Sequence, residues 1–510
     1  MLAAGTTQAT DAVIDPRIAA DQPQVTRIVG AISPARIDAT IRKLVSFHTR
    51  HTLSDTTSDS TGIGAARRWI KAELERCGAG KLDVQFDGYV QPAGGRLSRD
   101  TEIVNVVATL KGTQSPDRIY VVSGHYDSRV SDVMDATSAA PGADDDASGT
   151  AAVMELACVM AQHRFDATLV FMAVAAEEQG LFGATHWAQQ AQEKNLDIAG
   201  MFTNDIIGSS RAEDGRIDNS HVRLFAEGIP AVKEMTDPLR TLLATGGESD
   251  SLSRQLARHV KEMGERYVPG FTVNIIQRRD RYLRGGDHIP FLERGYAALR
   301  FTEPNEDYRH QHQDLRTENG VQMGDLPEFT DPEYTAQVAR VNAAALATLA
   351  LAPAAPANVR VKVAQLENDT QLVWDANAEA DLAGYRIVWR DTTSPVWQHS
   401  QWAGNVTEYR VKGVSKDNVF FGVQAVDTDG NVSVASYPLR DAFVGRLKAR
   451  RAGADMSEAS MTGTDDVGSA PVALDPTCVG RVATAGMPTF AAHTIGNCNP
   501  FSRAHSMAMS

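Results

Sequence analysis

Two uninterrupted apolar runs constrain the fold of this chain more than any other feature. RIYVVSG occupies residues 118–124, and ATLVFMAVA occupies residues 167–175. A strand that is apolar along its whole length must be buried on both faces, and such strands occur mainly in parallel sheets covered by helices. The two runs therefore predict the centre of a parallel sheet with helices on both sides.

Strand and helix patterns alternate around these two runs. This alternation predicts an α/β domain with a mostly parallel central sheet flanked by helices, over residues 25–352. Residues 1–24 are small and polar, and we expect a flexible N-terminal segment there. Further strands are expected at residues 82–86, 102–110, 198–206 and 296–302, and helices at residues 37–45, 64–77, 147–162, 181–192 and 334–349.

The pattern changes after the Pro/Ala linker LAPAAP. Residues 356–440 contain short alternating strands separated by turn residues, which predicts a small all-β sandwich. With Trp374 in LVWD, Tyr385 in LAGYRIVWR and the late segment VFFGVQAVDTDGNVS, this part resembles a fibronectin type III module. Residues 441–510 contain few large apolar residues, and we expect a disordered tail there.

Charge and hydropathy exclude several classes of function. The formal net charge is -14 at pH 7, so the surface repels nucleic acid and anionic membranes. No apolar run reaches the roughly 18 residues that a membrane helix needs. A soluble enzyme or binding protein remains, and nothing in the sequence fixes its oligomeric state.

The four cysteines bear on the compartment of the protein. Cys77 and Cys158 stand in helix-like segments, and we interpret them as separate buried thiols. Cys478 and Cys498 form either one local disulfide or two unrelated thiols. The start MLAAGTTQATD shows no signal peptide, which leaves a cytoplasmic protein open. A disulfide and a fibronectin-like module are both more common outside the cytoplasm, so we expect a secreted or periplasmic protein.

Residues able to bind metal or move protons follow the predicted strands. His125 and Asp127 stand in SGHYDS, Glu177 and Glu178 in AEEQG, and Asp205 in NDIIG. In open α/β sheets, ligands bind at the carboxyl ends of the strands. Each signal alone has an ordinary explanation, such as a surface histidine or a solvated strand end. In chain order at successive strand ends, they indicate one site.

Two further segments complete the set. The triplet Asp144-Asp145-Asp146 stands in PGADDDASG, just before a predicted helix. Three adjacent carboxylates repel one another, and divalent cations offset that repulsion. A late loop, HQHQD, supplies His310 and His312. Five nitrogen and oxygen ligands with one shared carboxylate suit two zinc ions roughly 3.5–4 Å apart.

The chain resembles the M28 family of dizinc aminopeptidases over residues 36–351. The motifs that carry the likeness are SGHYDS, PGADDDASG, EEQGLFGA, NDIIG, GGDHIPF and HQHQD. The family commonly has Asn-Asp-Asn where this chain has three aspartates. The resemblance implies a cis peptide bond between Asp145 and Asp146. It also implies two Zn²⁺ ions, Glu177 as general base, and the ligands His125, Asp145 as the bridge, Glu178, Asp205 and His310.

The late loop offers a choice of imidazole. His310 lies four residues before Asp314, the spacing that the family favours, so we rank it above His312. Five residues are expected to support the ligands or line the substrate pocket: Asp127, Asp287, His288, Tyr308 and His312.

The implied activity is removal of N-terminal, apolar residues from peptides. Three alternatives remain open from the sequence. The first is a glutaminyl cyclase-like enzyme with a single zinc. The second is a carboxypeptidase-like enzyme that would use Arg279, Arg281 and Arg284 to bind a substrate carboxylate. The third is a non-catalytic binding protein, which would have no need of a free base such as Glu177.

Overall fold

A mixed eight-stranded sheet organises the α/β part of the chain. The computed structural model describes residues 21–230, 236–364 and 366–440. The strand order is β1-β2-β4-β3-β5-β8-β6-β7. The strands are β1 (Asp83–Gln91), β2 (Thr101–Leu110), β3 (Ser115–His125), β4 (Ala167–Val174), β5 (Asp197–Asn204), β6 (His221–Ala226), β7 (Thr272–Ile276) and β8 (Ala298–Thr302).

The centre of the sheet is parallel, as the apolar runs predict. Strands β4, β3, β5 and β8 pair in parallel, and so do β6 and β7. The joins β1–β2, β2–β4 and β6–β8 are antiparallel. Strands β6 and β7 were not expected from the sequence, because HVRLFA and TVNII are short and carry polar residues. The predicted α/β fold with a mostly parallel central sheet is confirmed.

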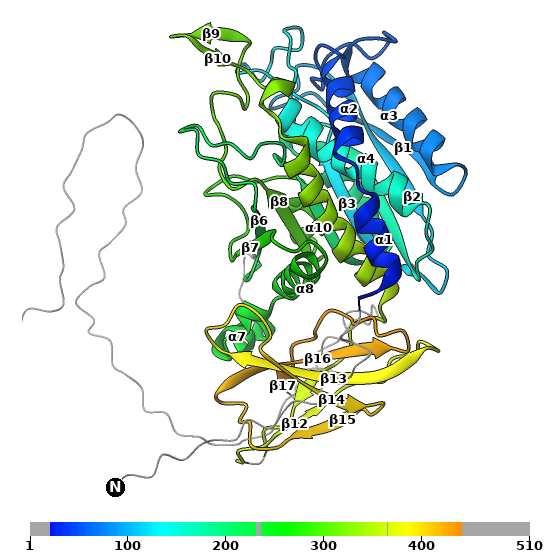
Figure 1. Cartoon of the computed structure of the whole chain (residues 1–510), viewed down its shortest axis with the longest axis vertical. Helices are drawn as coiled ribbons and strands as arrows, with labels where there is room; N and C mark the ends of the chain where they lie inside the picture. The colour runs from blue at the N-terminus through cyan, green and yellow to red at the C-terminus, as the bar shows by residue number, and fades with distance from the viewer. Residues whose placement is uncertain (1–20, 231–235, 365, 441–510) are drawn as a thin grey trace, which may run out of the picture. The chain divides into compact units, whose positions relative to one another are not determined.

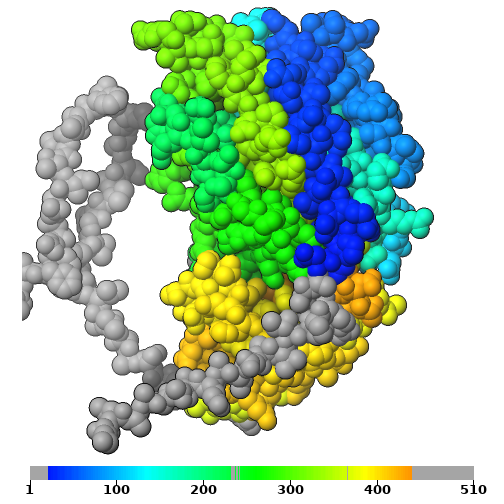
Figure 2. All heavy atoms as spheres, in the orientation of Figure 1, coloured from blue at the N-terminus to red at the C-terminus, as the bar shows by residue number. Residues whose placement is uncertain are grey.

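Helices cover both faces of this sheet. Alternate residues of β4 divide between two cores, with Leu169 and Phe171 in one and Val170 and Met172 in the other. Figure 1 shows α1, α2, α4, α8 and α10 in front of the sheet, and Figure 2 shows α1 and α2 (blue) on that face of the molecule. The helices of the larger core are α1 (Pro23–Ala31), α2 (Pro34–Val45), α3 (Gly62–Gly78), α4 (Gly149–Met160), α8 (Leu252–Tyr267) and α10 (Pro332–Leu351).

Shorter elements complete the α/β part. The smaller core includes residues of α6 (Phe182–Glu193) and α9 (Ile289–Leu292). Within the described part of the chain, no helix is both long and apolar enough to cross a membrane. The remaining elements are η1 (Ala143–Ser148), α5 (Glu177–Gly180), α7 (Asp237–Ala244), η2 (Gly247–Asp250), η3 (Pro327–Phe329) and the hairpin of β9 (Arg316–Glu318) and β10 (Val321–Met323).

A disulfide joins α3 to α4. Cys77 and Cys158 are bonded, so the interpretation of two separate thiols is wrong. Helical periodicity places each cysteine in a helix, but it does not say which helices pack together. The expectations for residues 1–20, for the tail at 441–510 and for Cys478 and Cys498 lie outside the described residues.

Two small sheets form the predicted β-sandwich. One has the order β15-β12-β11-β17 and the other β14-β13-β16. Trp374 is buried, and its ring centroid lies 5.2 Å from that of Tyr385. The likeness to a fibronectin type III module stays a prediction. The strands are β11 (Arg360–Val361), β12 (Thr370–Val373), β13 (Leu382–Asp391), β14 (His399–Gly404), β15 (Glu408–Val411), β16 (Val419–Asp427) and β17 (Leu439–Arg440).

A buried ion cluster links the sandwich to the α/β part. Asp250 accepts hydrogen bonds from Arg258 of α8 and from Arg390 of β13, each at 2.8 Å. The three side chains are almost completely buried. Removing one partner from such a cluster leaves an uncompensated buried charge, so the two parts depend on each other for stability.

The disulfide predicts a measurable contribution to stability. Replacing Cys77 and Cys158 together by serine should lower the free energy of unfolding by about 2–5 kcal/mol, because the bond closes a long loop in the unfolded chain. The bonded residues are 81 positions apart in the sequence. Denaturant unfolding of the oxidised protein and of the double variant measures the difference. Equal denaturant midpoints for the two proteins would contradict a disulfide between Cys77 and Cys158 in the native protein.

Candidate active site

The parallel strands deliver their polar residues to one edge of the sheet. His125 is the last residue of β3, and Asp205 directly follows β5. Glu177 and Glu178 open α5, three residues after the end of β4. Because β3, β4 and β5 are parallel neighbours, their carboxyl ends meet, as the sequence predicts.

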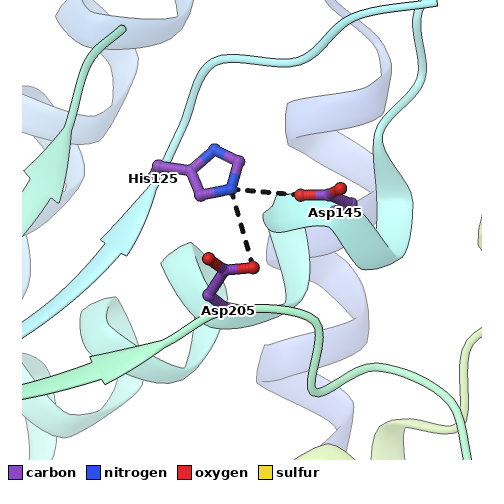
Figure 3. A group of neighbouring side chains, drawn as sticks. All are labelled: His125, Asp145 and Asp205. Carbon is purple, nitrogen blue, oxygen red and sulfur yellow. Dashed lines mark ion pairs between the residues drawn. The ribbon is translucent and has the colours of Figure 1, made fainter. Parts of the chain in front are cut away.

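A first group of ligand-type side chains surrounds His125. Its Nε2 lies 3.1 Å from Asp145 Oδ1 and 4.0 Å from Asp205 Oδ1 (Figure 3). All three residues are buried. Their ligand atoms lie close enough together to hold one metal ion.

A second group forms on the other oxygen of Asp145. His312 Nε2 lies 2.8 Å from Asp145 Oδ2 and 2.8 Å from Glu178 Oε1. These atoms could also hold a metal ion. Asp145 therefore presents one carboxylate oxygen to each group, the arrangement expected of a bridging ligand.

The structure places His312, and not the higher-ranked His310, beside Asp145 and Glu178. His310 stacks on Phe329, with 3.7 Å between ring centroids, and its Nδ1 lies 3.7 Å from Asp307 Oδ2. His312 has a left-handed backbone, with φ of 57°. Spacing along the sequence could not show which side chain this irregular loop turns toward Asp145.

Hydrogen bonds give the three adjacent aspartates different roles. The backbone N–H groups of Asp144 and Asp145 donate to the two carboxylate oxygens of Asp325, each at 2.8 Å. Asp144 accepts from the N–H of Gly208 at 2.7 Å. The turn is thus fixed by Asp325, which leaves the Asp145 carboxylate free to face the histidines.

The third aspartate ties this turn to the sheet. Asp146 accepts from the N–H of His125 at 2.9 Å and from the N–H of Gly149 at 3.0 Å. A side chain at Gly149 would put its Cβ 2.0 Å from the carbonyl oxygen of Asn204, so only glycine fits there. The peptide bond between Asp145 and Asp146 is cis, as the resemblance implies.

Asp127 positions the turn that carries the two glutamates. Its carboxylate oxygens accept from the N–H groups of Glu177 and Glu178, each at 3.2 Å. Its carbonyl oxygen lies 3.2 Å from His125 Nδ1, whereas its carboxylate lies 3.6 Å away. The expected support for the imidazole therefore comes mainly from the backbone of Asp127, and its side chain orients the glutamates.

Burial and neighbouring charge separate the acids of the site. Burial raises the pKa of Glu177 well above its ordinary value, and the carboxylates of Asp205 and Glu178 raise it further. Burial alone would also raise the pKa of Asp145, but His312 and His125 outweigh it and hold the pKa well below its usual range. Glu177 can therefore exchange a proton while Asp145 stays ionised.

Three residues that the sequence analysis did not select hold the ligands. Arg300 donates to Asp205 Oδ1 at 2.7 Å, and Gln311 donates to Asp145 Oδ2 at 3.1 Å. Arg129 donates to Glu178 Oε2 at 2.9 Å. Of these three residues, Arg300 is the one whose role the sequence could have indicated. A single arginine inside the buried strand YAALRFT requires a buried acidic partner.

The residues expected near the pocket divide into two sets. Tyr308 and His312 line a cavity of about 520 Å³, together with Glu177, Asp145 and other residues of the site. Asp287 and His288 are buried instead, and burial raises the pKa of Asp287 to about 8. His288 Nε2 lies 2.9 Å from the carbonyl oxygen of Arg279. A cavity of this size suits a small ligand or the end of a peptide.

The donor set fits zinc. Each group combines imidazole nitrogen with carboxylate oxygen, the ligand types of catalytic zinc sites. Asp205 Oδ2 is buried and accepts no hydrogen bond from the described residues, so it has a lone pair available for a cation. Among the described residues, neither group includes Glu177, which leaves this carboxyl free to move protons.

Comparisons with known proteins agree with this chemistry. The sequence profile of peptidase family M28 matches residues 105–320. A probable zinc metalloprotease of Leptosphaeria maculans is 48% identical over 422 residues, covering 82% of this chain and 97% of the relative. A probable zinc metalloprotease of Pyricularia oryzae is 49% identical over 418 residues, and the match covers 80% of this chain and 83% of the relative.

A similar solved structure is that of the Legionella pneumophila LapA aminopeptidase. It is 19% identical with a TM-score of 0.45, and the match covers 64% of this chain and 74% of that one. The sequence relatives cover most of the chain at high identity, whereas this structural likeness is remote. The sequence relatives and the family profile together show that the chain belongs to peptidase family M28, a family of zinc metalloproteases to judge by the names of these relatives.

Proposed function

We propose that this protein is an aminopeptidase that uses two zinc ions. The observation that carries the proposal is the position of Asp145, which directs one oxygen to each group of ligands. His125 and Asp205 would hold one ion, and Glu178 and His312 the other. A glutaminyl cyclase-like enzyme with a single zinc would need only one of the two groups.

Glu177 is the general base of the proposed reaction. Zinc held by these residues would supply a water of lowered pKa and would polarise the peptide carbonyl. The carboxylate of Glu177 accepts a proton from the attacking water and returns it to the nitrogen of the leaving amine. Asp127 fixes this geometry, because its carboxylate holds the backbone of Glu177 and Glu178.

Recognition of the free α-amine would determine that the enzyme cleaves peptides from the N-terminus. The cavity is lined by the proposed zinc ligands Asp145, Glu178 and Asp205 and by Glu177. A free α-amine could coordinate a zinc ion held there or pair with a carboxylate beside it. A substrate with a blocked N-terminus lacks this amine and would bind less well. The proposal therefore predicts that blocking the N-terminus of a peptide slows its cleavage, which an enzyme acting at the C-terminus would not show.

We also propose that the protein is exported. The disulfide between Cys77 and Cys158 is the support, because structural disulfides persist mainly in oxidising compartments. A secreted or periplasmic exopeptidase would degrade peptides outside the cytoplasm.

The two imidazoles of the late loop provide a matched test of the metal site. His312→Ala should lower the zinc content from two ions per chain toward one, because it removes a proposed ligand. His310→Ala, two residues away, should retain both ions, because its ring stacks on Phe329. Elemental analysis after dialysis measures the content. Equal metal loss in both variants would contradict the ligand assignment, and one ion in the unmodified protein would favour the single-zinc alternative.

The base assignment predicts a loss of rate without a loss of metal. Glu177→Gln should reduce kcat on aminoacyl anilides by roughly 10²–10⁴-fold, the usual contribution of a general base. Its zinc content should be unchanged, since Glu177 is not a proposed ligand. Glu178→Gln is the control, and we expect it to lose zinc as well as activity. Near-normal turnover of Glu177→Gln would refute the role.

Export can be tested on the native gene product in its own organism. Cell fractionation should place the full-length protein outside the cytoplasm, and thiol labelling without reductant should leave Cys77 and Cys158 unmodified. A purely cytoplasmic protein with both thiols reduced would overturn the proposal.

A further inference from the structure

Arginine is the main side chain of the cavity wall outside the ligands and the base. Four arginines line it, namely Arg96, Arg129, Arg281 and Arg284. Among the residues that the structure describes, the large apolar residues of the wall are Ile206 and Tyr308. Such a wall is poorly suited to the apolar side chain that the family resemblance implies, because an apolar group would have to desolvate these cations without replacing their hydrogen bonds.

Two of these arginines already have acidic partners of their own. Arg129 donates to Glu178, and its Nη2 lies 2.6 Å from His312 Nδ1. Arg281 donates to Asp280 at 3.1 Å and to Glu306 at 3.0 Å, and its side chain is only 9% exposed. These two side chains support the site and are not free to bind substrate.

Arg284 shares its acidic partner with two other arginines. It donates to Glu306 at 2.9 Å, but Glu306 also accepts from Arg281 and from Arg223. Glu306 and Asp280 together serve three guanidinium groups, those of Arg223, Arg281 and Arg284, so positive charge remains in excess. The side chain of Arg284 is 34% exposed, so this excess is accessible from the cavity.

Arg96 differs from the other three arginines in lacking an acidic partner within the described part of the chain. It lies in the turn between β1 and β2, where Gly94 pairs with Leu97, and it donates to the carbonyl oxygen of Glu178 at 2.7 Å. Among residues 21–230, 236–364 and 366–440, no carboxylate lies within ion-pair distance of its guanidinium. A hydrogen bond to the backbone orients Arg96 at the cavity and leaves its charge uncompensated.

We propose that Arg96 and Arg284 bind a carboxylate of the peptide substrate next to the scissile bond. The inference rests on the proposed aminopeptidase function and specifies its substrate class. The carboxylate belongs either to an acidic first residue or to the free C-terminus of a dipeptide. Guanidinium groups suit this task because their planar array of donors matches carboxylate geometry.

Pairs of substrates that differ only by acid or amide test the proposal. The first pair is the p-nitroanilides of Glu and Gln, and the second is the dipeptide Ala-Ala and its C-terminal amide. In at least one pair, kcat/KM should be roughly tenfold or more higher for the acid, the factor expected of a charge-assisted hydrogen bond. Arg96→Gln or Arg284→Gln should reduce that ratio about tenfold.

Arg216→Gln is the control, because Arg216 is an exposed arginine that pairs with Asp214 and does not line the cavity. Its acid-to-amide ratios should equal those of the unmodified enzyme. The contrary result is a kcat/KM for the acid within twofold of that for the amide in both pairs, measured in unmodified enzyme that cleaves the anilides. That result would refute carboxylate recognition and leave the aminopeptidase proposal standing.

Failure of the aminopeptidase proposal would be recognised by a different result. If N-acetyl-Ala-Ala is cleaved as fast as Ala-Ala, the aminopeptidase proposal fails, while a high acid-to-amide ratio still supports the arginine site. If no peptide is cleaved, calorimetry on the zinc-loaded protein decides. Tighter binding of L-glutamate than of L-glutamine, lost in Arg96→Gln or Arg284→Gln, supports the proposal, and equal binding overturns it.

Discussion

The concentration of buried carboxylates at the sheet edge is the constraint on which the rest of the site depends. Asp145, Asp146, Asp205 and Glu178 are buried there, and Asp144 is half-buried beside them. Like charges in a poorly solvated place repel strongly, and an unpaired buried charge is costly. The fold can keep these groups together only by surrounding them with donors and cations.

The chain meets this requirement in three ways. Backbone N–H groups solvate Asp144, Asp146 and Asp325, so these carboxylates act as anchors for the turn. Arginines compensate others, as Arg300 does for Asp205. The remaining charge is on Asp145, between two imidazoles, where metal ions fit. The need to compensate these carboxylates therefore explains both the hydrogen bonds that hold the turn and the grouping of side chains that could bind metal.

Contacts outside the candidate active site hold the carboxyl-terminal edge of the sheet in place. Helix α4 begins directly after the aspartate turn, and the disulfide at its other end joins it to α3. Arg50, buried beneath the turn, donates to the carbonyl oxygens of Pro141 and Gly142 at 2.6 and 2.8 Å. These contacts restrict the motion of the turn that carries Asp145. Under the proposals above, the acidic site would hold the metal ions and the arginines of the cavity wall would bind a substrate carboxylate.

The sequence by itself determined the α/β class and the sandwich, and it selected most of the residues that the structure brings together at the candidate site. Apolar runs, helical periodicity and the order of His125, Asp145, Glu177, Glu178 and Asp205 are local signals, and parallel strands bring such residues to one edge. The tertiary structure decided the pairing of Cys77 with Cys158, the choice of His312 over His310, and the arginines of the cavity. These depend on which distant segments pack together and which way an irregular loop turns. A sequence pattern records the period of each element, but not its neighbours in space.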